Sequence, residues 1–355
     1  ITSILHGEDL FAIAPLSGGR FVVSWTDHNT VGEDSSLGAI KAQVFNGDGS
    51  TSGAEFLVNS TILHSQERPS IATLTDGRFV VSWQDHSQSG SDSSGAAIRA
   101  QIFDPGDGAL HLTGTSAGDV LQGGAGADVL DGLAGNDRLL GQDGDDTLLG
   151  GDGNDTLNGG DGDDVIVGGS SSADLRDVVY GGSGNDNIDG GYGNDLIYGQ
   201  DGNDTLAGGF GADDLQGMNG DDVITGSALS DLVYGGAGND FVNGGFGYDR
   251  INGGAGADKF FHLGVFDHGS DWIQDYQAAE GDVLLFGNTS AGADDFQVNF
   301  AHTANEAGER SGDDDVAEGF VIYRDTGQIM WALVDGAGQD EINLKIGSEV
   351  FDLLA

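Results

Sequence analysis

The sequence contains no cysteine, little positive charge and no long hydrophobic run. Without cysteine, disulfides and zinc sites built from thiolates are excluded. No apolar run approaches the roughly 18 residues of a membrane-spanning helix. Lys and Arg total 12 against 59 Asp and Glu, and the net charge of -47 repels phosphate backbones and anionic membrane surfaces. Nucleic acid is therefore excluded as a partner, and cations are favoured.

Glutamate is also scarce, although the chain is strongly acidic. Only ten of the acidic residues are Glu, and none of them lies between Gly114 and Phe261. A solvated acidic surface would mix Glu with Asp, because both serve solubility. The exclusive use of Asp indicates a short carboxylate held close to the backbone, as in turns and Ca²⁺-binding loops.

Residues 1–110 contain a repeat with a period of 58 residues. The segment "IAPLSGGRFVVSWTDH" (13–28) recurs as "IATLTDGRFVVSWQDH" (71–86), and "GAIKAQVF" (38–45) recurs as "AAIRAQIF" (96–103). Alternating and β-branched runs bounded by Gly and Asp predict about four short antiparallel strands per unit. Repeats of this kind are typical of propeller blades or stacked β units.

Two such units cannot close a propeller. Either further units precede Ile1, or the two units pack as a small sandwich against the next region. The chain starts at a unit boundary, without Met or a signal segment, which favours a truncated array from a processed or longer protein.

Residues 111–261 contain a second and shorter repeat. Asp recurs at nine-residue steps, with one step of thirteen, and an apolar residue stands two places after each Asp. The sixteen aspartates are Asp119, Asp128, Asp137, Asp146, Asp155, Asp164, Asp177, Asp186, Asp195, Asp204, Asp213, Asp222, Asp231, Asp240, Asp249 and Asp258. A disordered linker has no reason to keep this register.

The repeat has the form G-G-x-G-x-D-x-U-x, with U apolar, which is the signature of Ca²⁺-binding parallel β-helix repeats. The first six residues predict a turn whose glycines accept positive φ, and the last three predict a minimal strand with one inward side chain. The residue before the Asp is mostly Asn, Asp or Ala, which we interpret as tolerance of a left-handed backbone. Two repeats form one 18-residue coil, with an aspartate at each edge.

The stacked aspartates require a cation. Coils lie roughly 4.8 Å apart, and two carboxylates at that distance repel by about 3.5 kcal/mol at an effective dielectric constant of 20. A Ca²⁺ ion between coils reverses the sign of this interaction, because it takes six to eight oxygen ligands from carboxylates and turn carbonyls. Mg²⁺ fits less well, because it requires a tight octahedron.

Segments such as "GGAGADVLDG", "GGDGNDTLNG" and "GGAGNDFVNG" resemble the repeats-in-toxin (RTX) nonapeptides of bacterial type I secretion substrates, hemolysin-type calcium-binding proteins. The resemblance covers residues 114–261, and "GGAGADKFFH" with the residues up to 286 is similar to the segment that closes such arrays. It implies one-step export by the type I secretion machinery, an uncleaved C-terminal signal, and folding outside the cell where calcium is plentiful.

Some repeats depart from the pattern. "VIVGGSSSADLRD" inserts four residues near 168–177 and lacks the turn glycine, so we expect the calcium ladder to break there. "GSALSD" (226–231) and "GTSAGD" (114–119) are also imperfect. Blocks at 128–164, 186–222 and 240–258 remain, and they predict about seven well-formed sites.

The predicted ligands are carboxylates and turn carbonyls from these blocks. The carboxylates are Asp128, Asp137, Asp146, Asp155, Asp164, Asp186, Asp195, Asp204, Asp213, Asp222, Asp240, Asp249 and Asp258. The turn glycines are Gly126, Gly135, Gly144, Gly153, Gly162, Gly184, Gly193, Gly202, Gly211, Gly220, Gly238, Gly247 and Gly256. Weaker candidates are Asp119, Asp177, Asp231, Asp271 and Asp275.

Residues 262–355 contain less glycine and more aromatic residues. "DVLLF" (282–286), "FQVNF" (296–300), "GFVIYR" (319–324) and "QIMWALV" (328–334) predict strands. We expect a compact β cap domain that covers the open end of the solenoid and leads into the secretion signal. The predicted fold class is all-β: propeller-blade-like antiparallel repeats, a parallel β-roll, and this cap.

No catalytic constellation is evident, and we predict that the chain is not an enzyme. His6 matches His64 and His28 matches His86 through the 58-residue period, and no HExxH or GxSxG motif accompanies the other histidines. The acidic loops at 27–36 and 85–94 are interpreted as solvated loops rather than calcium or sugar sites.

Two functions remain open. One is a secreted calcium-binding scaffold or adhesin whose partners include extracellular polysaccharide or a cell surface. The other is the calcium-dependent secretion region of a larger hydrolase, with the catalytic domain before Ile1. The sequence upstream of Ile1 distinguishes them, and the first is favoured.

Overall fold

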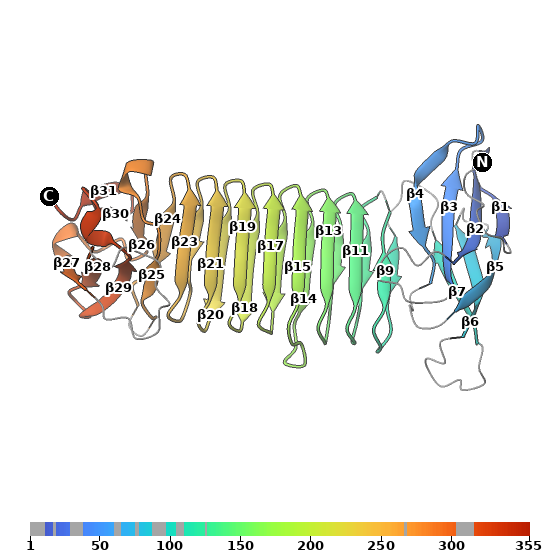
Figure 1. Ribbon diagram of the computed structural model, residues 1–355, viewed down its shortest axis with the longest axis horizontal. Helices are drawn as coiled ribbons and strands as arrows, with labels where there is room; N and C mark the ends of the chain where they lie inside the picture. The colour runs from blue at the N-terminus through green and yellow to red at the C-terminus, as the bar shows by residue number, and fades with distance from the viewer. Residues whose placement is uncertain are drawn as a thin grey trace. The chain divides into compact units, whose positions relative to one another are not determined.

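The computed structural model describes residues 11–16, 19–28, 38–59, 65–74, 78–86, 97–103, 110–124, 126–265, 268–302 and 316–355. Their regular structure is all β apart from a few short 3₁₀ turns (Figure 1). The chain forms two compact units, Ile1–Asp161 and Gly162–Ala355. The expectations for His6, His64 and most of the two acidic loops concern residues outside the described ranges.

Residues 11–103 form two antiparallel sheets, with strand orders β1-β2-β3-β4 and β5-β6-β7. The strands are β1 (Phe11–Pro15), β2 (Phe21–Asp27), β3 (Ala39–Phe45), β4 (Thr51–Leu57), β5 (Gln66–Thr73), β6 (Phe79–Asp85) and β7 (Ala97–Phe103). β6 and β7 repeat the bounds of β2 and β3 at the 58-residue offset, which confirms the predicted antiparallel repeats.

The two sheets share one hydrophobic core. Val22 and Ile40 of the first sheet are fully buried in the same cluster as Phe79 and Val81 of the second. β6 alternates between fully and partly buried residues, as its period-two pattern predicts, whereas β3 is buried along almost its whole length. The two repeats therefore pack on each other.

The expectation of about four strands per repeat is correct only for the first. The counterpart of β4 in the second repeat falls on β8 (His111–Thr113), which pairs in parallel with β10 (Val129–Asp131). Among the described residues, the second sheet therefore contains three strands. β8 is the strand at which the chain leaves the antiparallel repeats and enters the parallel region.

Within each unit, the strands from β8 to β25 pair in parallel with the strand two places away in the chain. In the first unit the ladders are β8-β10-β12 and β9-β11-β13. The further strands of these ladders are β9 (Val120–Gln122), β11 (Arg138–Asp143), β12 (Thr147–Leu149) and β13 (Thr156–Asp161).

The second unit contains a parallel β-solenoid of the same kind, with even-numbered strands in one sheet and odd-numbered strands in the other. Its strands are β14 (Val165–Gly169), β15 (Val178–Ser183), β16 (Asn187–Gly191), β17 (Leu196–Asp201), β18 (Thr205–Phe210), β19 (Asp214–Asn219), β20 (Val223–Ala228), β21 (Leu232–Ala237), β22 (Phe241–Asn243), β23 (Arg250–Ala255), β24 (Lys259–His262) and β25 (Asp271–Ile273).

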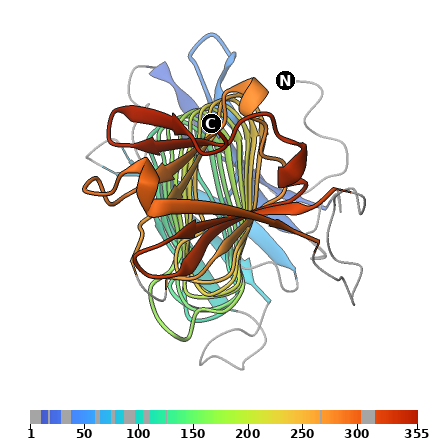
Figure 2. The same ribbon diagram turned by 90° about the vertical axis from the view of Figure 1, so that its left-hand side faces the viewer.

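The register of these strands confirms the 18-residue coil. Ile197 lies opposite Leu215, and Leu215 opposite Val233, so the apolar residue of each repeat stacks on its equivalent in the next coil. Every one of the sixteen apolar residues that follow the aspartates is at most 2% exposed. In Figure 2 the coils of the second unit superpose when viewed along their stack. The predicted core column is therefore confirmed.

The C-terminal residues add strands to both solenoid sheets. β26 (Val283–Phe286) and β30 (Asn343–Ile346) extend the even sheet in parallel, and β29 (Gln328–Leu333) extends the odd sheet. Antiparallel strands finish the two sheets: β27 (Phe296–Ala301), β28 (Glu318–Tyr323) and β31 (Glu349–Asp352).

Aromatic side chains fill the space between the added strands. The Phe286 ring lies 4.9 Å from both the Phe296 and the Tyr323 ring centroids, and Trp331 is fully buried. The four segments predicted as strands in this region are strands, and the cap continues the two sheets of the solenoid. No helix in the described part of the chain is long and apolar enough to cross a membrane.

An ion pair recurs in both antiparallel repeats. Lys41 lies 3.0 Å from Asp27, and the equivalent Arg99 pairs with Asp85, whose side chain is only 1% exposed. We expect Arg99→Ala to lower the free energy of unfolding by about 3 kcal/mol, because it withdraws positive charge from a buried carboxylate. Lys41→Ala, at a more exposed pair, should cost about 1 kcal/mol or less. Urea denaturation of both variants measures the difference, and equal costs would contradict the assignment.

Candidate metal centre

The repeat aspartates lie at the ends of the turns, immediately before or at the start of a strand, along both edges of the solenoid. All sixteen are buried, none more than 3% exposed. Asp271 and Asp282, beyond the last perfect repeat, are buried to the same degree. Buried carboxylates at this density require hydrogen bonds and opposite charge to offset the loss of water.

One oxygen of most of these carboxylates belongs to a hydrogen-bond ladder between coils. The backbone N–H of Asp195 donates to Oδ1 of Asp213 at 2.8 Å, and the N–H of Asp213 donates to Oδ1 of Asp231 at 2.9 Å. The same bond joins residues 18 apart along both edges, from Asp119 to Asp137 in the first unit and from Asp240 to Asp258 in the second. The pairs predicted from the spacing are therefore brought together.

The carboxylate column continues through the insertion near 168–177. The N–H of Asp164 donates to Asp186 Oδ1 at 2.9 Å across 22 residues, and that of Asp177 donates to Asp195 Oδ1 at 2.8 Å. The expected break is therefore wrong for the carboxylates, because the extra residues bulge out of the turn and leave the strand register unchanged. Asp119, Asp177 and Asp231, predicted as weaker, occupy the same buried position as the others.

The turns keep their shape even where glycine is missing. Most of the predicted turn glycines, from Gly135 to Gly256, have φ between 117° and 158°. In the turn before Asp231, Ser227 and Leu229 instead adopt φ of 80° and 83°. A left-handed conformation costs a residue with a Cβ roughly 1–2 kcal/mol, so the rest of the coil must offset this strain.

The second oxygen of each carboxylate faces bare glycine backbone. A Cβ on Gly199 would lie 2.3 Å from Asp204 Oδ2 and 2.9 Å from the carbonyl oxygen of Gly217 in the next coil. A Cβ on Gly211 would lie 1.5 Å from the carbonyl oxygen of Gly193. Glycine at these positions thus leaves room for the carboxylate and for the backbone of the neighbouring coil, with which a Cβ would clash.

In the part of the chain that the structure describes, many of these second oxygens have no hydrogen-bond partner. They are buried Oδ2 atoms of Asp137, Asp186, Asp195, Asp204, Asp213, Asp222, Asp231, Asp240, Asp249 and Asp258. A buried carboxylate oxygen without a donor is costly, and a hard cation satisfies it. No group of three or more His, Asp or Glu side chains converges among the described residues, so the backbone carbonyls must complete the coordination.

The residue before each aspartate has a role that differs from the predicted one. None of these residues has positive φ, so the left-handed explanation is wrong. Instead, their side chains form a second ladder: Asn203 N–H donates to Asn185 Oδ1 at 3.0 Å, and Asp221 N–H donates to Asn203 Oδ1 at 2.7 Å. Asn and Asp are favoured here because a short side chain with an oxygen acceptor reaches the backbone of the next coil.

One column ends at Asp271, which was predicted as a weaker candidate, and the other ends at a residue that was not predicted. Asp282, which the sequence reasoning missed, accepts the Asp258 N–H at 2.9 Å. Its signal is the apolar Leu284 two places later, the same spacing as Asp271 and Ile273. Asp275 accepts the N–H groups of Gly253 and Gly254 with both oxygens, so it caps the stack rather than joining the ladder.

Burial changes the acid–base behaviour of the column. Desolvation is the largest cause and, together with the charges of neighbouring aspartates, raises the pKa of Asp137, Asp195, Asp204, Asp231 and Asp240 to about 7, although the hydrogen bond from a backbone N–H lowers it. Desolvation also raises the pKa of Asp271 well above its usual range, with the Asp249 charge as a second cause. In the absence of a cation, these raised pKa values favour the protonated, uncharged form of the aspartates.

The family model for RTX calcium-binding nonapeptide repeats (four copies) matches residues 113–148, 140–172, 180–215, 207–242, 216–251 and 234–264. The solenoid is an RTX calcium-binding repeat array. Its cofactor is Ca²⁺, and the oxygen-only donor set of the RTX turns suits this ion. No curated protein matches the chain.

The raised pKa values predict how pH acts on the RTX array without calcium. Because the pKa of these aspartates is higher in the folded than in the unfolded chain, protonation stabilises the fold. This contribution is fully present below about pH 4 and is lost as the pH rises through about 7. In EGTA, far-UV circular dichroism should therefore show more β structure at pH 5 than at pH 8. A larger β signal at pH 8 would contradict the burial argument.

Proposed function

We propose that the chain is a secreted scaffold or adhesin region that Ca²⁺ folds after type I export, with no catalytic role of its own. The observation that supports this most is the double column of buried aspartates, many of whose second oxygens have no hydrogen-bond partner among the described residues. Calcium is then a structural component of every coil. Calcium neutralises the charge of the carboxylates, which would otherwise have to be protonated in the folded chain.

The balance of energies favours a metal-dependent fold. Each nonapeptide buries one aliphatic side chain, worth roughly 1.5–3 kcal/mol. The same nonapeptide stacks one carboxylate on another, at a cost of about 3.5 kcal/mol, and desolvates both. The apolar column cannot outweigh this repulsion, so the solenoid folds when the cation is bound.

Metal-dependent folding fits export in an unfolded state. Extracellular calcium modules bind the ion at roughly 10⁻⁴–10⁻³ M, so the array stays unfolded where free calcium is low and folds where it is high. Calcium outside the cell thus triggers folding, and the exported chain requires no other signal.

His262 serves structure, which supports a non-catalytic chain. His262 is fully buried; its Nδ1 accepts the Gly264 N–H at 2.9 Å, and its Nε2 lies 3.3 Å from the Gly269 carbonyl oxygen. Both ring nitrogens are used, and desolvation lowers the pKa of His262 to about 4. The partner of the folded protein is then an extracellular surface rather than a substrate to be transformed.

A calcium titration of the full chain, followed by far-UV circular dichroism, tests the proposal. We expect a cooperative gain of β signal with Ca²⁺ at millimolar concentrations or below, and none with Mg²⁺. Asp213→Asn should raise the calcium midpoint several-fold, because Asp213 joins two coils. Asp214→Asn removes the same charge one residue away, where the side chain contacts Gln216, and should leave the midpoint unchanged. A full β signal in EGTA at pH 8, or equal effects of the two variants on the calcium midpoint, would contradict the proposal.

A further inference from the structure

The two antiparallel repeats have sheets that are largely apolar on both faces. One face, here called the aliphatic face, carries Val22, Ile40, Ala42 and Val44 in the first repeat and Val80, Ile98, Ala100 and Ile102 in the second. The other, here called the aromatic face, carries Phe21, Val23, Trp25 and Phe45 in the first repeat and Phe79, Val81, Trp83 and Phe103 in the second. An antiparallel sheet with one face in water is usually polar on that face. Two apolar faces per repeat therefore indicate a sheet that is covered on both sides.

The core between the repeats is built from opposite faces of the two sheets. Its cluster contains all the aliphatic-face residues of the first repeat, such as Ile40, and all the aromatic-face residues of the second, such as Phe79. The pairing inside the chain is thus aliphatic face against aromatic face. Because it joins two different surfaces head to tail, it leaves one face of each kind outside the shared core.

The aliphatic face of the second repeat is open to solvent. Ile98 is 78% exposed, although its equivalent Ile40 is fully buried. Ile102 is 48% exposed, against 6% for its equivalent Val44. The residues that β6 and β7 place on this face are all uncharged: Val80, Ser82, Gln84, Ile98, Ala100 and Ile102. Large apolar side chains that are exposed as a group mark an interaction surface.

The aromatic face of the first repeat is open on its β1 side. Phe11 and Ile13 are 62% and 59% exposed, and they lie opposite Trp25 and Val23 on this face. Trp25 itself is buried. By the 58-residue offset β1 corresponds to β5, which lies against β1 and β2 in the internal pairing. Ile71 of β5, the equivalent of Ile13, packs against the shared core. The open part of the aromatic face is therefore the part that the internal pairing uses.

We propose that a second copy of the chain docks on the aliphatic face of the second repeat, with the β1 side of its own aromatic face. Phe11 and Ile13 of the second copy then pack on Ile98 and Ile102, as Ile71 packs on the first repeat within one chain. The contact repeats the internal pairing between two copies. Since each copy keeps one free face, association is head to tail and produces chains or closed rings of copies.

A second copy is the occupant because it carries the matching face. The internal pairing shows that a face with Phe and Trp side chains fits one with Ala, Val and Ile. The net charge of -47 opposes the approach of two copies, but exposed charges are screened beyond about 8 Å at physiological ionic strength. Self-association goes beyond the proposed function and does not depend on it, because the antiparallel repeats have a hydrophobic core of their own.

Sedimentation velocity of the full chain, in saturating calcium and about 0.15 M NaCl, tests the proposal. We expect species larger than the monomer to increase with protein concentration, with a dissociation constant of about 10–100 μM. Ile98→Lys and Ile13→Lys, made separately, should each weaken association by about tenfold or more, because each buries a charge in the contact. A mixture of the two variants should form dimers only, since it retains one intact face of each kind.

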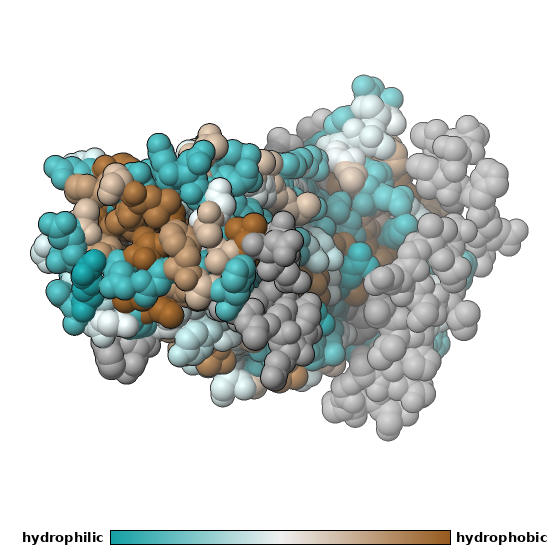
Figure 3. Space-filling model, turned by 60° about the vertical axis from the view of Figure 1, so that its left-hand side comes forward, coloured by the Kyte–Doolittle hydropathy of each residue, from teal (hydrophilic) through white to brown (hydrophobic). Residues whose placement is uncertain are grey.

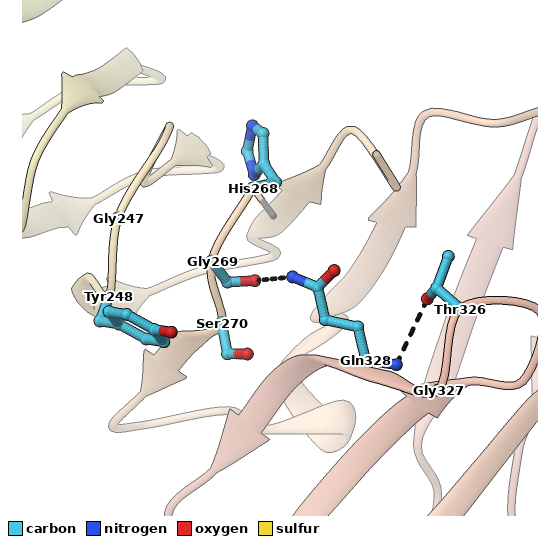
Figure 4. Close-up of a pocket in the computed structure, with 8 residues that line it drawn as sticks. All are labelled: Gly247, Tyr248, His268, Gly269, Ser270, Thr326, Gly327 and Gln328. Atoms are coloured by element: carbon cyan, nitrogen blue, oxygen red, sulfur yellow. Dashed lines mark hydrogen bonds between the residues drawn. The ribbon is translucent and has the colours of Figure 1, made fainter. Parts of the chain in front are cut away.

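Tyr248→Lys and Val350→Lys are the matched controls, because they place the same charge at other exposed side chains. Tyr248 is 70% exposed and lines a pocket in the second unit (Figure 4). Val350 is 54% exposed and belongs to the C-terminal part, where Figure 3 shows hydrophobic residues gathered on the surface. Neither variant should change the dissociation constant.

Circular dichroism of each variant with calcium separates this inference from the proposed function. A chain that folds with calcium but stays monomeric at every concentration overturns the self-association alone. Association that survives Ile98→Lys, or that Val350→Lys removes, overturns it as well. Loss of association with Ile98→Lys but not with Ile13→Lys indicates a symmetric contact between two aliphatic faces and contradicts the head-to-tail pairing. A chain that fails to fold with calcium contradicts the proposed function instead.

Discussion

The structure depends on the burial of one carboxylate per nonapeptide at a spacing where like charges repel. Oδ1 of most of these aspartates offsets part of the cost by accepting a backbone N–H from the neighbouring coil, as Asp213 does from Asp195. Many of the Oδ2 atoms have no hydrogen-bond partner among the described residues. A divalent cation turns this arrangement from repulsive to cohesive. The buried aspartates therefore form the metal site and also make folding depend on the metal.

Much of this was predictable, because short-range stereochemistry fixes the repeat. The Asp-x-apolar spacing sets the inward column, from Leu121 to Phe260, and two nonapeptides per coil set the 18-residue register. The strands of the cap followed from their alternation. The antiparallel repeats followed from a 58-residue period that the bounds of β2 and β6 reproduce. The sequence analysis correctly predicted the role of residues whose role depends on neighbours within about nine positions in the chain.

The errors concern roles that only the stacked coils define. The side chains before the aspartates, such as Asn185 and Asn203, act on the next coil, 18 residues away, rather than on their own backbone. The insertion near 168–177 was predicted to break the calcium ladder because its sequence lacks the turn glycine. The sequence does not reveal that the inserted loop bulges outward. Asp282 escaped notice because its partner Asp258 lies at an irregular distance of 24 residues. The number of calcium ions per chain stays a prediction, and the continuous carboxylate column favours more than the seven sites expected.

Amide hydrogen exchange of the full chain at pH 8, with calcium and with EGTA, tests the central claim most directly, because it reports on each region separately. The account predicts that amides of residues 126–261 are strongly protected with calcium and exchange rapidly in EGTA. Residues 39–45 and 79–85, which have a hydrophobic core of their own, should stay protected in both conditions. Equal protection of the aspartate turns in EGTA and in calcium would contradict the claim that the cation holds the solenoid together.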